Sequence, residues 1–309
     1  MAICFVTANF AFRGYWNGVG LTMVYMRIII VMHALNIFLN WVLIYGNLGA
    51  PAMGVTGAGI ASAISVGIGS LAHIIIAFQL AGKHGFLKRF HGFARSLRGV
   101  VALSVPAGTQ NIFFSAGFVA LFAIAQKIGT TELAAANVLI ALTLTCVLPA
   151  LGFGLAAATL VGQSLGKGHK DHAVIWTWST VQLGAMVLAF VGGILAVAPD
   201  LWISFLVNDT ATRALSVAPL ILLACFQPID SVGVVLSQVL LGGAGAVRTV
   251  MVISITLQWV IFLPIAYYVA VVMGGGLIGL WITKMGWRTL FSLAMMAAVR
   301  HGKWTETSV

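Results

Sequence analysis

Long apolar segments follow one another through this chain almost without interruption, and they constrain its fold more than any motif does. Hydrophobic residues make up 61% of the 309 positions and charged residues only 7%, whereas charged residues make up about a quarter of a soluble domain. A run of about 20 apolar residues crosses a hydrocarbon core of about 30 Å. Because no water there can bond the backbone, such runs must be helices or barrel strands, and continuous apolarity lacks the alternation of a barrel strand. The sequence therefore predicts an all-α polytopic membrane protein.

Short turns rich in Gly, Pro and Asn separate the apolar segments. Residues 1–12 are apolar but too short to span a membrane, and we interpret them as the end of a further helix rather than as a frayed tail. About eight spans are expected, at residues 21–45, 54–81, 99–125, 132–160, 173–198, 212–241, 247–273 and 275–299.

A glycine pattern occurs twice in the chain. Residues 17–20 (NGVG) and 54–57 (GVTG), each followed by an apolar run, correspond to residues 242–245 (GGAG) and 276–279 (GLIG). Such internal repeats are typical of secondary transporters, whose substrate path lies between two related bundles. About six apolar runs end at the second copy, whereas the first copy begins close to Met1, so we expect the front of the first bundle to be missing.

Because the two copies are preceded by different numbers of apolar runs, we expect the chain to consist of three parts. Residues 1–82 are expected to be the remnant of an N-terminal lobe with two transmembrane helices, residues 83–98 a basic cytoplasmic linker, and residues 99–309 a complete C-terminal lobe of six helices.

The net charge of +10 is distributed unevenly between the loops. If the N-terminus is cytoplasmic, only Lys127 and Arg213 lie in outer loops. This is the positive-inside bias of a multi-pass membrane protein. It predicts a protein of the cell (inner) membrane with both termini cytoplasmic. Because the basic residues follow this topology, the net charge does not indicate a nucleic-acid partner. The basic residues on the inner side are Arg13, Lys83, Lys88, Arg89, Arg95, Arg98, Lys167, Lys170, Arg248, Arg300 and Lys303.

Motifs for enzymatic chemistry are absent from the sequence. No GxxxxGK[ST], HExxH or GxSxG pattern occurs, and Cys4, Cys146 and Cys225 lie far apart with no CxxC pair. A membrane-embedded transferase would need a cluster of acids or histidines inside the spans, and the sequence contains none. We therefore expect neither an enzyme nor a cofactor.

One acid stands in the middle of an apolar segment. Asp230 shares a helical stripe with Gln227, and Pro228 removes a backbone hydrogen bond beside them. A charge at the centre of a bilayer costs about 2.5–3.5 kcal/mol on insertion scales, so such a residue usually faces a cavity or a partner. Asp230 is therefore either an ion-binding residue or half of a structural ion pair with Lys284 or Arg288 of the last span, and the two roles are compatible.

Other polar side chains inside the spans are candidates for the lining of a substrate cavity. Gln110, Asn111 and Ser115 follow Pro106 in the third span, and Asn137 lies in the fourth. We assign these four residues to one cavity together with Gln227.

Several segments carry a resemblance to a known family. Residues 13–20 (RGYWNGVG), 39–46 (LNWVLIYG) and 49–62 (GAPAMGVTGAGIAS) resemble the fifth and sixth helices of the multidrug and toxic compound extrusion (MATE) family. Residues 133–137 (LAAAN) and 154–166 (GLAAATLVGQSLG) resemble its eighth helix and the following loop. The resemblance implies two six-helix lobes that form a V around a central cavity.

The resemblance also assigns a role to Asp230, which matches the acid of the family's tenth helix because residues 240–242 (LLG) fall where the family has Leu-Arg-Gly. Leu241 replaces the arginine of that motif. The acid that many bacterial members carry in the seventh helix is absent, and its place falls near Phe114 and Ser115.

The expected function is a cation-coupled antiporter that exports organic, cationic or amphipathic compounds in exchange for H⁺ or Na⁺. The coupling ion would bind at Asp230, no other metal is expected, and the expected partners are a small organic substrate and the bilayer, with the protein a monomer. Two alternatives remain, a lipid-linked glycan flippase of the same superfamily and a truncated fragment that does not transport.

The charge bias generates a prediction about orientation. A His84→Cys variant should resist labelling by a membrane-impermeant thiol reagent applied to intact cells, because the basic loop that contains it should be cytoplasmic. The same variant should be labelled once the membrane is opened. Labelling in intact cells would reverse the topology.

Overall fold

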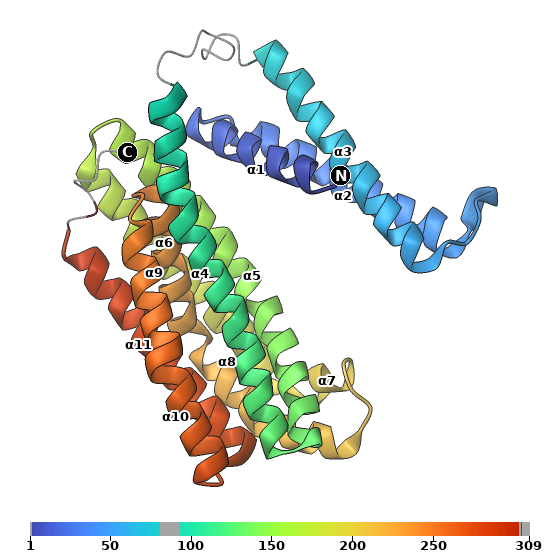
Figure 1. The fold of residues 1–309 in the computed structure, drawn as a ribbon, viewed down its shortest axis with the longest axis vertical. Coiled ribbons are helices and arrows are strands. Elements are labelled where there is room, and N and C mark those ends of the chain that lie inside the picture. The colour runs from blue at the N-terminus through green and yellow to red at the C-terminus, as the bar shows by residue number, and fades with distance from the viewer. Residues whose placement is uncertain (1, 81–92, 303, 305–309) are drawn as a thin grey trace. The chain divides into compact units, whose positions relative to one another are not determined.

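The computed structural model describes residues 2–80, 93–302 and 304, and its helices confirm the all-α prediction, since no strand occurs in these ranges. The chain divides into two compact units, Met1–Phe93 and Ala94–Val309, drawn in blue to cyan and in green to red in Figure 1. Residues 83–92 of the expected basic linker lie outside the described part. The rest of that segment belongs to helix α4, which begins at Phe93.

The first unit consists of α1 (Ala2–Gly18), α2 (Thr22–Tyr45), the short turn η1 (Asn47–Gly49) and α3 (Gly54–Leu80). Because residues 2–12 are helical, the alternative of a frayed tail is wrong. Helix α3 packs against both α1 and α2. In its core the indole Nε1 of Trp16 donates to Nδ1 of His73 over 3.0 Å, and the rings of Phe12 and Tyr25 stack on the same histidine.

The second unit is built around α8. The helices α5, α6 and α11 all pack against it, so its central turns are buried. Its elements are α4 (Phe93–Ile128), α5 (Thr130–Gly166), α6 (Lys170–Val197), α7 (Pro199–Ser204), α8 (Thr210–Gln238), η3 (Val239–Gly243), α9 (Val247–Ile255), η4 (Thr256–Phe262), α10 (Leu263–Tyr267), η5 (Tyr268–Val272) and α11 (Gly276–Arg300).

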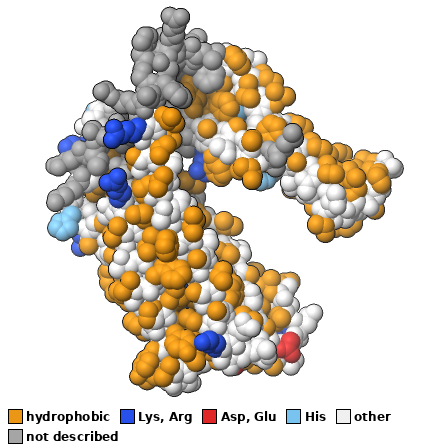
Figure 2. All heavy atoms as spheres, in the orientation of Figure 1, with side chains coloured by type: hydrophobic (Ala, Val, Ile, Leu, Met, Phe, Trp, Pro, Cys, Tyr) orange, Lys and Arg blue, Asp and Glu red, His pale blue; other side chains and the backbone are white. Residues whose placement is uncertain are grey.

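Seven of the described helical segments are long and apolar enough to cross a membrane. They coincide with the first seven of the expected spans. The eighth, residues 275–299, is the helix α11, but Lys284 and Arg288 make it too polar to qualify by composition. Figure 2 shows hydrophobic side chains over most of the visible surface of the second unit, with Lys and Arg toward its ends. Phe190, for example, is 71% exposed, as expected of a surface that faces lipid.

The two copies of the glycine pattern adopt the same backbone conformations. Gly20 and Gly245 have φ of 80° and 67°, and Gly54 and Gly276 have φ of 54° and 58°. These values lie in the left-handed region, which glycine enters at no steric cost. Each pair of glycines therefore marks the two turns that flank one apolar helical segment, α2 in the first unit and α9 to η5 in the second.

A glycine inside α3 allows the helical hairpin of the first unit to close. A Cβ atom added at Gly57 would lie 2.5 Å from the carbonyl oxygen of Leu43 in α2, whereas one added at Gly59 would meet nothing within 4 Å. Small residues at such crossings let helices in a membrane approach each other closely.

The contrast between these two glycines generates a prediction about stability. Gly57→Ala should destabilise the first unit by about 1–3 kcal/mol, because the methyl group overpacks the contact with a rigid backbone. Gly59→Ala in the same helix is the matched control, and it should leave stability unchanged or raise it slightly. Thermal unfolding of the detergent-solubilised chain measures both. Equal melting temperatures for the two variants would contradict a tight contact at Gly57.

Candidate functional site

The centre of α8 carries the candidate site. The helix continues through Pro228, which cannot donate to the carbonyl of Ala224. Helix α6 approaches α8 closely at that same carbonyl, since a Cβ added at Gly192 would lie 2.3 Å from its oxygen. Two residues further along α8, Asp230 lies in a tightly packed region, with its side chain only 12% exposed.

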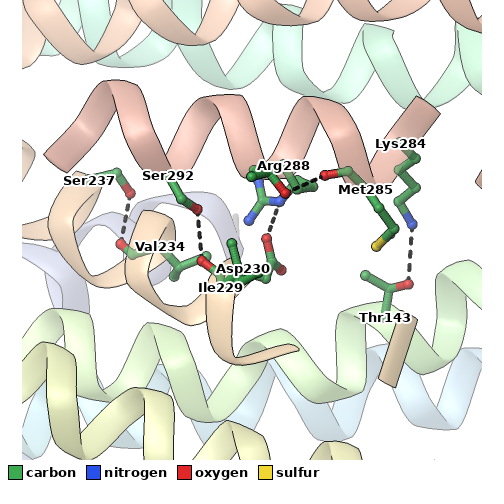
Figure 3. Close-up of polar contacts among 10 residues, drawn as sticks. Thr143, Ile229, Asp230, Val234, Ser237, Lys284, Met285, Arg288 and Ser292 are labelled. Carbon is green, nitrogen blue, oxygen red and sulfur yellow. Dashed lines mark hydrogen bonds and ion pairs between the residues drawn. The ribbon is translucent and has the colours of Figure 1, made fainter. Parts of the chain in front are cut away.

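Asp230 forms an ion pair with Arg288 of α11. The guanidinium Nε donates to the carboxylate Oδ1, and the Arg288 side chain is 14% exposed (Figure 3). One turn further along α11, the hydroxyl of Ser292 donates to the carbonyl of Ile229 over 2.8 Å. These two contacts tie α11 to α8 side by side.

Lys284 was the other basic candidate, and it bonds elsewhere. Its ammonium donates to Oγ1 of Thr143 in α5 over 3.3 Å and lies 4.8 Å from the centre of the Trp281 ring. Figure 3 shows Lys284 and Arg288 extending from α11 toward the same side, one to α5 and the other to α8. Lys284 is only 3% exposed, so a basic side chain is buried among neutral partners.

The remaining predicted residues differ in their burial and in their contacts. Gln227 is buried one turn before Asp230, and its Oε1 has no hydrogen-bond partner within residues 2–80, 93–302 and 304. Gln110 instead donates to Ser254 of α9 over 3.4 Å. The other three, Asn111, Ser115 and Asn137, are exposed, and the Asn137 amide bonds its own helix at Leu133.

Within the described residues, none of the four side chains of α4 and α5 that were assigned to the cavity hydrogen-bonds with Asp230, Lys284 or Arg288. The structure therefore brings together Asp230 and Arg288, with Gln227 one turn from Asp230 on α8 and Lys284 one turn from Arg288 on α11. It leaves Gln110, Asn111, Ser115 and Asn137 outside these contacts.

Two residues of the site were missed in the sequence. Thr143 could not be identified from the sequence, because the hydroxyl of a threonine in a helix can bond the backbone of its own helix. The Thr143 hydroxyl does so as well, at the carbonyl of Leu139. Trp281 could have been found, because it precedes Lys284 and Arg288 at i, i+3 and i+7, which places all three on one helical stripe. Among the described residues, no group of three or more His, Cys, Asp or Glu side chains could hold a metal ion.

Comparisons with known proteins agree with this architecture. The model of the MatE family matches residues 106–268, which include most of α4 to α10 and the whole of α8. The chain is 27% identical to the "Probable multidrug resistance protein NorM" of Thermotoga maritima, over 96% of the chain and 64% of that relative. It is 26% identical to the "Multidrug resistance protein NorM" of Aliivibrio fischeri, over 82% of the chain and 56% of that protein. The chain thus spans less than two thirds of the length of these relatives.

Solved structures show the same fold. A MATE family transporter of the MOP superfamily in an outward-facing conformation superposes with a TM-score of 0.84 at 20% identity, over 97% of this chain and 67% of the other. A MATE structure in the bent conformation gives a TM-score of 0.82, also at 20% identity, over 98% and 68%. These matches name transporters rather than enzymes. Since the family model matches more than half of its residues, this chain belongs to the MatE family.

Proposed function

We propose that this chain works in multidrug efflux, as a cation-coupled antiporter that exports organic compounds through the cell membrane. Membership of the MatE family and similarity to multidrug resistance proteins support this proposal. The organisation into two lobes, the monomeric state and the cytoplasmic position of both termini belong to the same proposal, the last on the charge bias.

The observation that carries the proposal is the buried ion pair between Asp230 and Arg288. A charged pair inside a membrane bundle is costly to desolvate, and such residues commonly mark ion pathways. A carboxylate held by a single guanidinium can exist in two states, paired when ionised and released when neutralised. A ligand that binds one of these states better shifts the equilibrium between them.

We favour H⁺ over Na⁺ as the coupling ion. The group in contact with the Asp230 carboxylate is a nitrogen donor, Arg288, and the charge of Lys284, one turn away on α11, acts on the same carboxylate. Sodium, a hard cation, needs several oxygen ligands and would have to displace the guanidinium. A proton on the carboxylate instead removes the charge that Arg288 pairs with. The hydrogen bond from Ser292 to Ile229 and the close packing at Gly233 would then still tie the two helices.

The first prediction concerns coupling. Asp230→Asn keeps the size of the side chain but removes its charge, so dye efflux driven by an imposed H⁺ gradient should fall to the level of cells without the gene. The measurement uses inverted membrane vesicles from cells that express the chain together with any coding sequence that continues its reading frame upstream. Asp209→Asn is the matched control, because Asp209 caps α8 outside the membrane span.

Normal efflux by Asp230→Asn, combined with a lower melting temperature, would make the acid purely structural. Loss of efflux in the Asp209→Asn control as well would point to a general folding defect rather than to coupling.

The second prediction concerns the energy of the ion pair. Arg288→Met leaves a buried carboxylate without its partner and should cost on the order of 3 kcal/mol in unfolding free energy. Combining Arg288→Met with Asp230→Asn should recover most of this loss, because no unpaired charge is left. Thermal or denaturant unfolding of the two single variants and the double variant measures the coupling energy. Purely additive effects would contradict a direct interaction between the two residues.

A further inference from the structure

The site around Asp230 carries more positive charge than negative charge. Asp230 is the one acid that the described part of the chain places in the middle of a membrane-spanning helix, and it is paired with Arg288. The ammonium of Lys284 is left with a hydroxyl and an indole ring as its neighbours. A buried charge is normally compensated by a partner of opposite sign. Among the described residues the acid whose charge acts on Lys284 is Asp230, which is already paired with Arg288, so two cations share one acid.

Hydrogen-bond donors are also in surplus on this face of α11. A lysine ammonium has three N–H donors and an arginine guanidinium has five, and one bond is formed by each of Lys284 and Arg288. The indole Nε1 atoms of Trp281 and Trp287 are buried and have no hydrogen-bond partner in the part of the chain that the structure describes. Each of these two rings lies beside a basic group, since Nζ of Lys284 is 4.8 Å from the Trp281 ring and Cζ of Arg288 is 5.4 Å from the Trp287 ring.

Buried polar groups in native proteins are nearly always hydrogen-bonded. These two pairs of donors, each with one cationic group, therefore match a ligand that brings oxygen acceptors and a negative charge. A cationic ligand would bring no negative charge, and it would meet two like charges in a region of low dielectric.

We propose that Lys284 is the centre of an anion-binding site for the carboxylate of an organic ligand, with Thr143 and Trp281 beside it. The inference rests on the proposed transport function, because it names an organic carboxylate as the substrate class. It differs from the expectation of cationic substrates that came from the family resemblance. The ion pair between Asp230 and Arg288 is neutral as a whole, so Lys284 is the residue that selects the charge of the ligand.

Three probes that share one ring and differ in charge test this site on the chain as it is, purified in an uncharged detergent. They are benzoate, benzamide and benzylammonium, each added at millimolar concentration. A ligand that binds the folded state alone raises the melting temperature. We expect benzoate to raise it more than benzamide does, and benzylammonium to have no effect.

Variants then assign the effect to Lys284. Lys284→Met keeps the length of the side chain and removes the buried charge, so the variant should fold at least as well as the parent. Its affinity for benzoate, measured by calorimetry, should fall about tenfold or more, which is the loss expected for one charge-assisted hydrogen bond. Lys284→Arg should retain the preference for benzoate. Lys127→Met is the matched control, because Lys127 is an exposed residue of α4 over the ring of Tyr267.

Three results would overturn the proposal: tighter binding of benzylammonium than of benzoate, an unchanged benzoate affinity in Lys284→Met, or no binding of benzoate to the folded parent chain. The experiment involves neither an ion gradient nor transport. A failure of proton coupling at Asp230 would therefore leave its outcome unaffected, and a failure of anion binding would leave the efflux test unaffected.

Discussion

The ion pair between Asp230 and Arg288 is the interaction on which the second unit depends. It holds two charges in the middle of a bundle whose outer surface is apolar, where each charge alone would be strongly destabilising. The pair joins α8, the central helix, to α11, the most polar of the long helices. Because α11 carries two basic residues, this contact with α8 is part of what allows so polar a helix to belong to a membrane bundle.

Close packing around α8 makes this contact possible. Gly192 brings the backbone of α6 against the carbonyl that Pro228 leaves without its usual donor, and Gly233 brings α11 against α8, where an added Cβ would lie 2.5 Å from the Ser292 hydroxyl. Lipid tails are as apolar as the helices, so association in a membrane depends on such close approach and on polar contacts between helices. Gly233 and the ion pair therefore stabilise the same interface between α8 and α11, whereas Gly192 stabilises the neighbouring interface between α6 and α8.

Much of the fold could be predicted from the sequence, but less of the site. The apolar runs located seven spans, because length and hydropathy alone decide whether a helix can cross a bilayer. Asp230 was evident as well, because a charged residue inside an apolar run is visible in the sequence itself. Its partner was not, because Lys284 and Arg288 lie one turn apart on the same stripe of α11 and the sequence does not show the axial register between α8 and α11. The partner of Gln110 could not be predicted for a similar reason. The helical period shows which residues share a face of a helix, but it does not show which helix packs against that face. The observed partner of Gln110 is Ser254.

The sequence by itself determined that this is a helical membrane protein with a repeated glycine pattern and one acid in mid-span, because these properties depend on composition, on φ preferences and on the cost of a charge in hydrocarbon. Only the tertiary structure decided that Arg288 neutralises that acid and that Lys284 is left beside Thr143 and Trp281. The physical reason is that the charge balance of a buried site depends on side-chain distances of a few ångströms. Those distances follow from how three helices far apart in the sequence pack together.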